Sequence, residues 1–538
     1  MWNPFQEERQ KFEPRLPRLL QQIECLDTIV SERRSVPLSI QSLLPQTSSQ
    51  PLMQFRVHVP KKMSALRVGV VLSGGQAAGG HNVITGLFDA LKILNPSSRL
   101  FGFLGGPSGI IENRYQELNA DCLASYRNVG GFDLIGAGRT KIEAPEQFEA
   151  ALRNCSELNL DGLVIIGGDD SNTNAALLAE YFLDHACRVC VIGVPKTIDG
   201  DLKSDLIETS FGFDTACKIY SEMIGNICRD ALSAKKYTHF IKLMGRSASH
   251  ITLECALQTH PNLALIGEEV AQKKMTLQQL VESICAVIAK RAEGGRNYGV
   301  VLIPEGLIEF IPEMTSLIQE LNALLSQGSQ ENEDVIKHLS PSGAATFAFL
   351  PAEIATQLLL DRDPHGNVQV SHIATEHMLI QLVKERLQSW PGYQGKFHPL
   401  GHFFGYEGRS GYPSNFDANY CYALGYTAAA LIGSRVTGYM SALQKLAESP
   451  EGWIPVGVPI TWMMDVEERK GKKKPVIKKA LVDLSGEPFN CFAAYREEWS
   501  LHDDYRFPGP IQYAGPSQLC DETTLTLKLE QHQAQGVH

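Results

Sequence analysis

Residues 67–82 read RVGVVLSGGQAAGGHN. The opening RVGVVLS is apolar and rich in valine, as in a strand that is buried on both faces of a sheet. Glycines follow it at once, and apolar residues then recur at helical spacing. Those helical positions are Val83, Ile84, Leu87, Phe88 and Leu91. The stretch therefore predicts a strand, a glycine-rich turn and a helix, which is the repeating unit of an α/β fold.

The same order of strand, loop and helix recurs along the chain. The further strands and their loops are LVIIG (163–167) before GDDSNT, CVIGV (190–194) before PKTIDGD, HFIKLMG (239–245) and YGVVLIPEG (298–306). Strands that alternate with helices predict parallel sheets covered on both faces. Ligands of such sheets lie beyond the carboxyl ends of the strands. The glycine-rich and charged segments all fall at those ends, which makes them the candidate site.

Two other regions differ from this repeat. In residues 1–66, apolar residues at helical spacing predict a helix that starts near Pro17, in an accessory extension suited to a subunit contact. These residues are Leu16, Leu19, Leu20, Ile23, Leu26 and Val30. Residues from about 307 to 400 are more polar and predict a helical insertion.

The bulk composition indicates a globular protein. The chain has 538 residues, 43% hydrophobic and 20% charged, with a formal net charge of −11. This acidic balance argues against a general nucleic-acid binder. The charged N-terminal segment lacks the apolar core of a signal peptide, and no apolar run reaches the roughly 20 residues needed to cross a bilayer. We therefore expect a cytoplasmic protein that binds neither nucleic acid nor a membrane.

One basic run raises nucleic-acid binding as an alternative. Residues 467–479 read EERKGKKKPVIKK. The run lacks interleaved aromatic residues and begins with two glutamates, so we interpret it as a solvated loop.

The first glycine-rich loop, residues 74–80, has the composition of a phosphate cradle. Glycines between a strand and a helix let backbone N–H groups approach an anion at the positive end of the helix. The alternative is an ordinary turn, since glycine turns follow strands in many α/β folds. The loop is neither a Walker A motif nor a dinucleotide fingerprint.

Acidic residues follow the next two strands. Asp169 and Asp170 stand at a predicted helix start, where an aspartate caps the helix or, beside a phosphate loop, binds Mg²⁺. The third loop places Lys196 close to Asp199 and Asp201. A cation and a base are what phosphoryl transfer requires in addition to a metal. A solvated turn is the alternative for the third loop taken alone.

Taken together and in this order, these segments resemble the phosphofructokinase family. The resemblance rests on GGQAAGGHN, GGDDSNT, PKTIDGD, MGR, PEG and YEGR, and spans residues 67 to about 425. It implies an α/β fold of two Rossmann-like lobes with parallel-rich sheets, in addition to the helical extension and insertion. The implied domains are 1–66, 67–212 with 411–490, 213–410 with the insertion at about 307–400, and a C-terminal segment 491–538.

Two positions make the chain similar to the pyrophosphate-dependent branch of that family. ATP-using relatives carry glycine where this chain has Asp170 and Lys196. The carboxylate of Asp170 would repel the α-phosphate of ATP, and Lys196 would neutralise the transferring phosphoryl group. The branch likeness assigns both residues to donor selection and to the transition state.

The resemblance implies a reversible transfer of phosphate from pyrophosphate to the 1-hydroxyl of fructose 6-phosphate. It assigns Gly75 to pyrophosphate, Asp169 to Mg²⁺ and Asp199 to proton abstraction. The further implied substrate contacts are Thr197, Ile198, Lys236, Tyr237, Met244, Gly245, Arg246, Glu305, Tyr406, Glu407, Gly408 and Arg409.

Within that set, the resemblance gives each group a part of the sugar phosphate. Met244, Gly245 and Arg246 form the sugar-binding turn, Glu305 accepts a hydroxyl, and residues 406–409 bind the 6-phosphate. Lys236 and Tyr237 reach the site of a neighbouring subunit, which implies a homo-oligomer.

Two other functions remain open from the sequence. An ATP-dependent enzyme of the same family is opposed by Asp170 and Lys196. A noncatalytic subunit that works with an active paralogue is opposed by the residues that remain intact, namely Asp169, Lys196, Asp199, Arg246 and Arg409.

Overall fold

The structure of the protein is a computed structural model, which describes residues 9–60, 62–326, 332–360, 368, 370–469, 472–510 and 521–535. The chain divides into two compact units. Unit 1 comprises the described residues within Met1–Ala216, Glu407–Ala480 and Ile511–Leu527, and unit 2 those within Cys217–Tyr406, Leu481–Pro510 and Lys528–His538. None of the described helices combines the length and apolar character needed to span a membrane.

Unit 1 is built on a mixed sheet whose centre is parallel. Its strand order is β1-β2-β15-β14-β8-β7-β3-β4-β5, with β6 paired to β3 and β9 paired to β8. Strands β14, β8, β7, β3 and β4 run parallel, and antiparallel strands flank them. The bounds are β1 Leu26–Val30, β2 Met53–Val57, β3 Arg67–Ser73, β4 Arg99–Phe103, β5 Tyr115–Leu118, β6 Ala137–Gly138, β7 Gly162–Gly167, β8 Cys190–Thr197, β9 Phe211–Gly212, β14 Tyr439–Gln444 and β15 Ile454–Pro459. The predicted strands at 67–73, 163–167 and 190–194 are confirmed.

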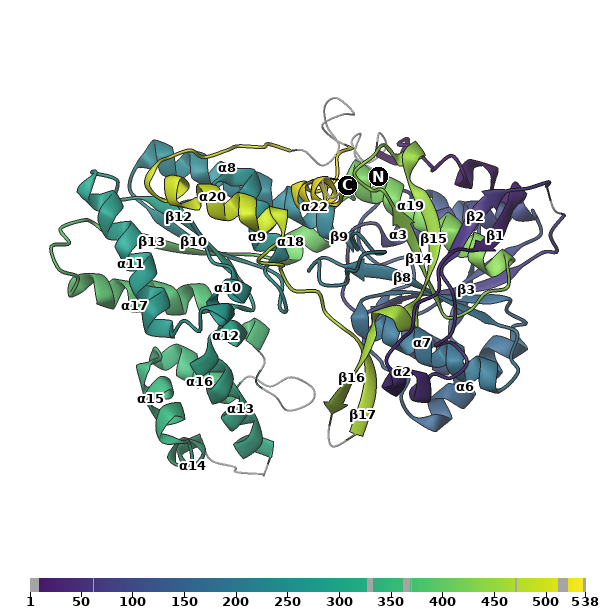
Figure 1. Cartoon of the computed structure of the whole chain (residues 1–538), viewed down its shortest axis with the longest axis horizontal. Coiled ribbons are helices and arrows are strands. Elements are labelled where there is room, and N and C mark those ends of the chain that lie inside the picture. Colours follow the sequence, from purple (N-terminus) through teal and green to yellow (C-terminus); the bar gives the residue numbers. More distant parts are fainter. Residues whose placement is uncertain are drawn as a thin grey trace. The chain divides into compact units, whose positions relative to one another are not determined.

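Helices cover both faces of this sheet (Figure 1). Helices α6 and α7 pack on one face over a core that includes Val71, Leu163 and Ile165. Helices α3 and α19 lie on the other face, where a Cβ on Gly86 would stand 2.2 Å from the carbonyl oxygen of Tyr422. Only glycine permits that backbone contact. The bounds are η1 Leu20–Cys25, α2 Leu38–Leu43, α3 Gly80–Leu94, α4 Pro107–Ile111, α5 Ala120–Ala124, α6 Pro145–Glu157, α7 Asp169–Asp184, α18 Tyr406–Arg409, α19 Asn415–Gly433, η3 Pro450–Gly452 and η4 Ile460–Met463.

The N-terminal segment corrects one expectation. A short 3-10 helix ends at Cys25, and Leu26–Val30 is strand β1, so the predicted helix through Val30 is wrong in its second half. β1 pairs with β2, and β2 pairs with β15 of the large sheet. Sheet pairing therefore overrides the helical spacing of Leu26 and Val30.

The basic run at 467–479 is also more ordered than expected. Residues Met464–Arg469 and Lys472–Ile477 form β16 and β17, an antiparallel pair. The prediction of a loop is therefore wrong for the residues of this run that form strands, whereas Lys478 and Lys479 follow β17 and are exposed. We call β16 and β17 the basic hairpin.

Unit 2 contains a parallel sheet of order β11-β12-β10-β13. Its strands are β10 Thr238–Leu243, β11 Leu263–Ala264, β12 Gly299–Pro304 and β13 Pro399–Phe404. Helices follow most of these strands, and helices α12 to α17 occupy the segment after Leu307, where they share a core with α11. The bounds are α8 Phe213–Ala234, α9 His250–Thr259, α10 Gly267–Gln272, α11 Leu277–Glu293, α12 Leu307–Phe310, α13 Pro312–Ser326, α14 Asn332–Lys337, α15 Pro341–Phe349, α16 Ala352–Leu360, η2 Val370–His372, α17 Thr375–Gln388, α20 Glu487–Leu501 and α22 Leu525–Gln535.

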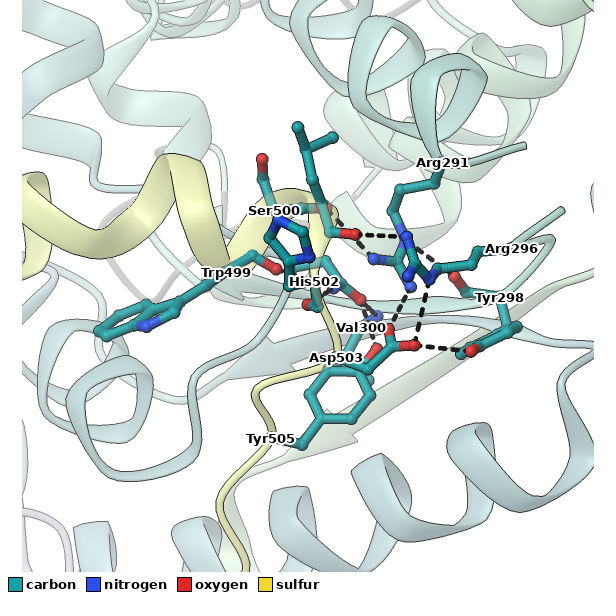
Figure 2. A network of polar contacts seen from close by, with 11 residues as sticks. Arg291, Arg296, Tyr298, Val300, Trp499, Ser500, His502, Asp503 and Tyr505 are labelled. Carbon is teal, nitrogen blue, oxygen red and sulfur yellow. Dashed lines mark hydrogen bonds and ion pairs between the residues drawn. The ribbon is translucent and has the colours of Figure 1, made fainter. Parts of the chain in front are cut away.

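A buried ion pair fastens the segment after α20 to this unit (Figure 2). Arg291 Nη2 lies 2.7 Å from Asp503 Oδ1, with side chains 3% and 14% exposed. The Tyr298 hydroxyl donates to Asp503 Oδ2 at 2.7 Å. Burial alone would raise the pKa of Asp503, but the hydrogen bonds from Arg291 and Tyr298 outweigh it and hold that pKa below its usual range.

Asp503→Asn should lower the free energy of unfolding by about 3 kcal/mol near neutral pH, because it leaves Arg291 buried without its counter-charge. A lowered carboxyl pKa stabilises the fold above the unfolded-state pKa, and that stabilisation disappears as pH falls through the folded value. The difference between variant and wild type should therefore shrink below about pH 4. Urea unfolding followed by tryptophan fluorescence at several pH values measures it.

The matched control is Glu282→Gln in the same unit. Glu282 pairs with Arg386 at 3.2 Å, and both side chains are 36% exposed. This loss should cost less than about 1 kcal/mol. Equal effects of the two substitutions would contradict a special role for Asp503.

Candidate active site

Three of the predicted loops leave neighbouring strands of unit 1. Strands β8, β7 and β3 are adjacent and parallel. Gly74 and Gly75 follow β3, Asp169 begins α7 just after β7, and Lys196 is the next-to-last residue of β8. Parallel strands end at one edge of a sheet, so these segments lie together.

The glycine loop lies directly against Lys196. A Cβ on Gly74 would stand 3.3 Å from Lys196 Nζ, and Gly74 has a φ of +84°. The Gly74 N–H donates to the Gly138 carbonyl at 2.8 Å. Glycine at 74 therefore supplies both the left-handed backbone and the room for the ammonium.

Two guanidinium groups lie beside Gly75. A Cβ on that glycine would stand 3.6 Å from Arg409 Nη1 and 3.8 Å from Arg139 Nη2. Arg139 follows β6, which pairs with the end of β3 at Ser73. The glycine loop of unit 1 is thus surrounded by three cations.

Arg139 and Lys141 were not singled out from the sequence. The segment GAGRTK, residues 136–141, places two cations after glycines, and this pattern could have indicated an anion-binding loop. Its strand β6 spans only Ala137–Gly138, too short for an apolar pattern. The predicted role of Arg409 at the sugar 6-phosphate stays a prediction, and its guanidinium lies beside Gly75.

The two acidic residues at the start of α7 each face a lysine. Asp170 Oδ1 lies 3.1 Å from Lys141 Nζ. Asp169 Oδ2 lies 3.8 Å from Lys479 Nζ, on the chain just after the basic hairpin. Carboxylates at a helix N-terminus are also stabilised by the helix dipole.

The loop after β8 is held in a fixed shape. The Thr197 hydroxyl accepts the Asp199 N–H at 3.1 Å, and the Thr197 carbonyl accepts from Ser210 Oγ at 3.1 Å. The Asp201 carbonyl accepts the Ala480 N–H at 2.7 Å. Ile198 is buried. Asp199 is therefore carried on a backbone that is tied down on both sides.

The charges of this cluster influence each other strongly. Burial lowers the pKa of Lys196 to about 8, although Asp199 and Asp169 oppose that change. Burial raises the pKa of Asp201 to about 7, and the negative charges of Asp199 and Asp169 add to the rise. The carboxylates are so close together that a bound cation would stabilise their charged forms.

Unit 2 brings together a second set of predicted residues. The Gly245 N–H donates to Glu305 Oε2 at 3.0 Å, and Glu305 is 4% exposed. The Met244 N–H donates to the Phe404 carbonyl at 2.9 Å. Arg246 is exposed. Pairing of β10 with β12 and β13 thus assembles the predicted sugar-binding turn with Glu305.

Lys236 and Tyr237 are not part of that assembly. They precede β10, whereas the turn at Met244 follows it, so they lie at the opposite end of the strand. Lys236 Nζ stands 5.1 Å from the Tyr237 ring centre. Of the remaining predicted residues, Tyr406 and Glu407 are exposed and Gly408 is buried in α18.

The chain is similar to known proteins along nearly its whole length. Residues 67–432 match the family described as Phosphofructokinase. A protein of Porphyromonas gingivalis named pyrophosphate–fructose 6-phosphate 1-phosphotransferase is 53% identical, over 97% of this chain and 98% of its own length. One of the same name from Treponema pallidum (strain Nichols) is 53% identical, over 98% of this chain and 96% of its own length.

A solved structure shares the fold. A pyrophosphate-dependent phosphofructokinase from Nitrosospira multiformis aligns with a TM-score of 0.55 at 14% sequence identity, over 86% of this chain and 96% of that chain. This likeness concerns the fold alone. The family match over residues 67–432 and the 53% identity of the two relatives show which family the chain belongs to. The chain belongs to the phosphofructokinase family.

Proposed function

We propose that the chain catalyses reversible transfer of a phosphoryl group from pyrophosphate to the 1-hydroxyl of fructose 6-phosphate, giving fructose 1,6-bisphosphate and phosphate. The observation that carries the proposal is the glycine loop at 74–75, with Lys196, Arg139 and Arg409 around it. Backbone N–H groups and several cations suit a small, highly charged anion. The printed names of the relatives in P. gingivalis and T. pallidum support the same reaction.

Asp170 is proposed to select pyrophosphate over a nucleotide. Its carboxylate is 55% exposed and its Oδ1 stands 3.1 Å from Lys141 Nζ, so it presents a negative charge at the start of α7. The α-phosphate of a nucleotide would meet that charge, whereas pyrophosphate has no third phosphate to place there. Lys196 then supplies the charge that stabilises the donor.

The residues present fit one Mg²⁺ ion that is shared with the substrate. In the described part of the chain, no group of three or more His, Cys, Asp or Glu side chains is placed to hold a metal. Mg²⁺ in phosphoryl-transfer sites commonly takes one or two carboxylates and completes its shell with phosphates and water. We assign Asp169 to this role, with Asp201 beside it. When bound, the ion would neutralise charge on the phosphates.

Asp199 is proposed as the general base. Its carboxylate takes the proton from the sugar 1-hydroxyl as that oxygen attacks the nearer phosphorus, and it returns the proton in the reverse reaction. Lys196 and Arg139 neutralise the negative charge of the pyrophosphate and of the leaving phosphate. No phosphorylated enzyme is needed, because the transfer is direct.

The sugar phosphate is assigned to the remaining predicted residues. Gly245, Arg246 and Glu305 of unit 2 bind the sugar. Lys236 and Tyr237 stand at the far end of β10, about 20 Å away along a six-residue strand. We therefore propose that they serve the site of a second copy, in a homo-oligomer. We also propose that the enzyme acts in the cytoplasm, where this reaction would serve glycolysis and gluconeogenesis.

The purified chain, supplied with Mg²⁺ and fructose 6-phosphate, should form fructose 1,6-bisphosphate with pyrophosphate and not with ATP, because Asp170 opposes the nucleotide. A coupled aldolase assay with each donor in turn measures this directly. The reverse reaction with phosphate should also proceed.

Rapid turnover with ATP and none with pyrophosphate would overturn the donor assignment. An absence of turnover with both donors would favour a subunit that needs an active paralogue.

A further inference from the structure

The basic hairpin is fastened to the helix that carries the two acidic residues. β16 and β17 pair in register from Met464↔Ile477 to Arg469↔Lys472. The Ile477 N–H donates to Thr173 Oγ1 at 3.1 Å, and Thr173 belongs to the first turns of α7. The end of the hairpin therefore lies close to Asp169.

Two backbone hydrogen bonds fix the position of Lys479. On one side of it, the Lys478 N–H donates to the Met463 carbonyl at 3.0 Å. On the other side, the Ala480 N–H donates to the Asp201 carbonyl at 2.7 Å. The backbone of Lys479 is thus joined to the loop that carries Asp199.

The ammonium of Lys479 faces the acidic cluster. It stands 3.8 Å from Asp169 Oδ2, with the lysine side chain 43% exposed. This distance exceeds the hydrogen-bonding range of about 2.7–3.2 Å, so the contact is electrostatic. The positive charge of Lys479 also opposes the rise in the pKa of Asp201.

Lys474 of the same hairpin has a different environment. Its ammonium lies 3.3 Å from Glu143, and both side chains are exposed. Lys474 is therefore a surface lysine of similar chemistry, outside the acidic cluster.

We propose that Lys479 is a pyrophosphate-binding residue, whose ammonium exchanges Asp169 for a phosphate oxygen when the donor binds. The inference rests on the proposed function. Asp169 is the carboxylate that we assign to the metal, so metal and ammonium compete for the same oxygens. The arriving phosphates offer the ammonium a stronger partner, because hydrogen bonds between ionised groups are short and strong.

The same residue should hold the product phosphate in the reverse reaction. Pyrophosphate and phosphate present the same kind of oxygen at this edge of the sheet. Fructose 6-phosphate is assigned to other residues, so its affinity should not depend on Lys479.

Lys479→Met should weaken binding of pyrophosphate in the presence of Mg²⁺ by about 10- to 100-fold, the effect of losing one charge-assisted hydrogen bond. Isothermal titration calorimetry without sugar measures this directly. In kinetics, the KM for pyrophosphate and the KM for phosphate should rise, and the KM for fructose 6-phosphate should stay within about twofold. Lys479→Arg should retain most of the affinity, since it keeps the charge.

The matched control is Lys474→Met, which should leave pyrophosphate affinity unchanged. Wild-type pyrophosphate affinity in both Lys479→Met and Lys479→Gln would overturn the inference, and so would a fall in kcat with unchanged KM values. If the wild-type chain itself does not bind or use pyrophosphate, the proposed function fails instead. Thermal unfolding of each variant confirms that affinities are compared between folded proteins.

Discussion

Asp199→Asn is expected to lower kcat by about a thousandfold, with little change in the affinity for fructose 6-phosphate. Asparagine keeps the size of the side chain and removes the group that accepts the proton. The loop should survive the change, because the Asp199 N–H donates to Thr197 Oγ1 at 3.1 Å and asparagine keeps this hydrogen bond. Steady-state rates in both directions, with calorimetric binding of the sugar phosphate, measure the effect.

Asp205→Asn is the matched control for this variant. Asp205 lies a few residues further along the same unit, and its carboxylate is exposed and paired with Arg34 at 2.6 Å. Its loss should leave kcat within about twofold of the wild type. A near-normal rate in Asp199→Asn would exclude Asp199 as the base and direct attention to Asp201, whose buried carboxyl has a pKa of about 7.

The central sheet could be predicted because its strands are short apolar runs followed by glycine. RVGVVLS and LVIIG carry that pattern in full, and both are strands at the expected positions. Once strands are parallel, the loops at their carboxyl ends must meet at one edge. The meeting of Gly74, Asp169 and Lys196 therefore follows from local patterns and one general rule.

The cations contributed from elsewhere could not be predicted in that way. Arg139 follows a two-residue strand, and Arg409 ends a four-residue helix. Neither element leaves a hydrophobic period in the sequence. Both guanidinium groups reach Gly75 through tertiary packing, which cannot be read from a short stretch of sequence.

For Lys479, the sequence led to a wrong prediction of the local structure. The run EERKGKKKPVIKK predicts a solvated loop from its charge, yet residues 467–469 pair with residues 472–474 as strands, and Lys479 follows the second strand with its side chain 43% exposed. The groups that accept backbone N–H donors of this segment, Thr173 Oγ1 and the Asp201 carbonyl, lie far away in the sequence. The composition of the run therefore could not predict that Lys479 faces Asp169.

The double variant Asp170→Gly with Lys196→Gly is expected to lose pyrophosphate-dependent turnover by about a hundredfold or more. Most of the loss should come from Lys196, because its buried ammonium lies against the glycine loop and interacts with Asp199 and Asp169. Removing it takes away the buried positive charge that faces those carboxylates where the donor must bind. Initial rates with pyrophosphate, for the double variant and for each single variant, measure the effect.

The same double variant should gain ATP-dependent turnover that the wild type lacks. Without Asp170, Lys141 loses the carboxylate that lies 3.1 Å from its ammonium and becomes available to a nucleotide phosphate. Asp184→Asn, an exposed acid at the other end of α7, is the control and should change neither donor. Wild-type rates with pyrophosphate in the double variant would contradict the donor assignment.

Asp170→Asn separates the two ways in which this residue would exclude ATP. Asparagine preserves the volume of the side chain and removes its charge. If charge repulsion excludes ATP, Asp170→Asn and Asp170→Gly should admit it to a similar extent. If volume excludes it, only glycine should do so. We expect charge to dominate, because the Asp170 side chain is 55% exposed and has room to turn aside, whereas its negative charge stays beside the phosphates in any rotamer.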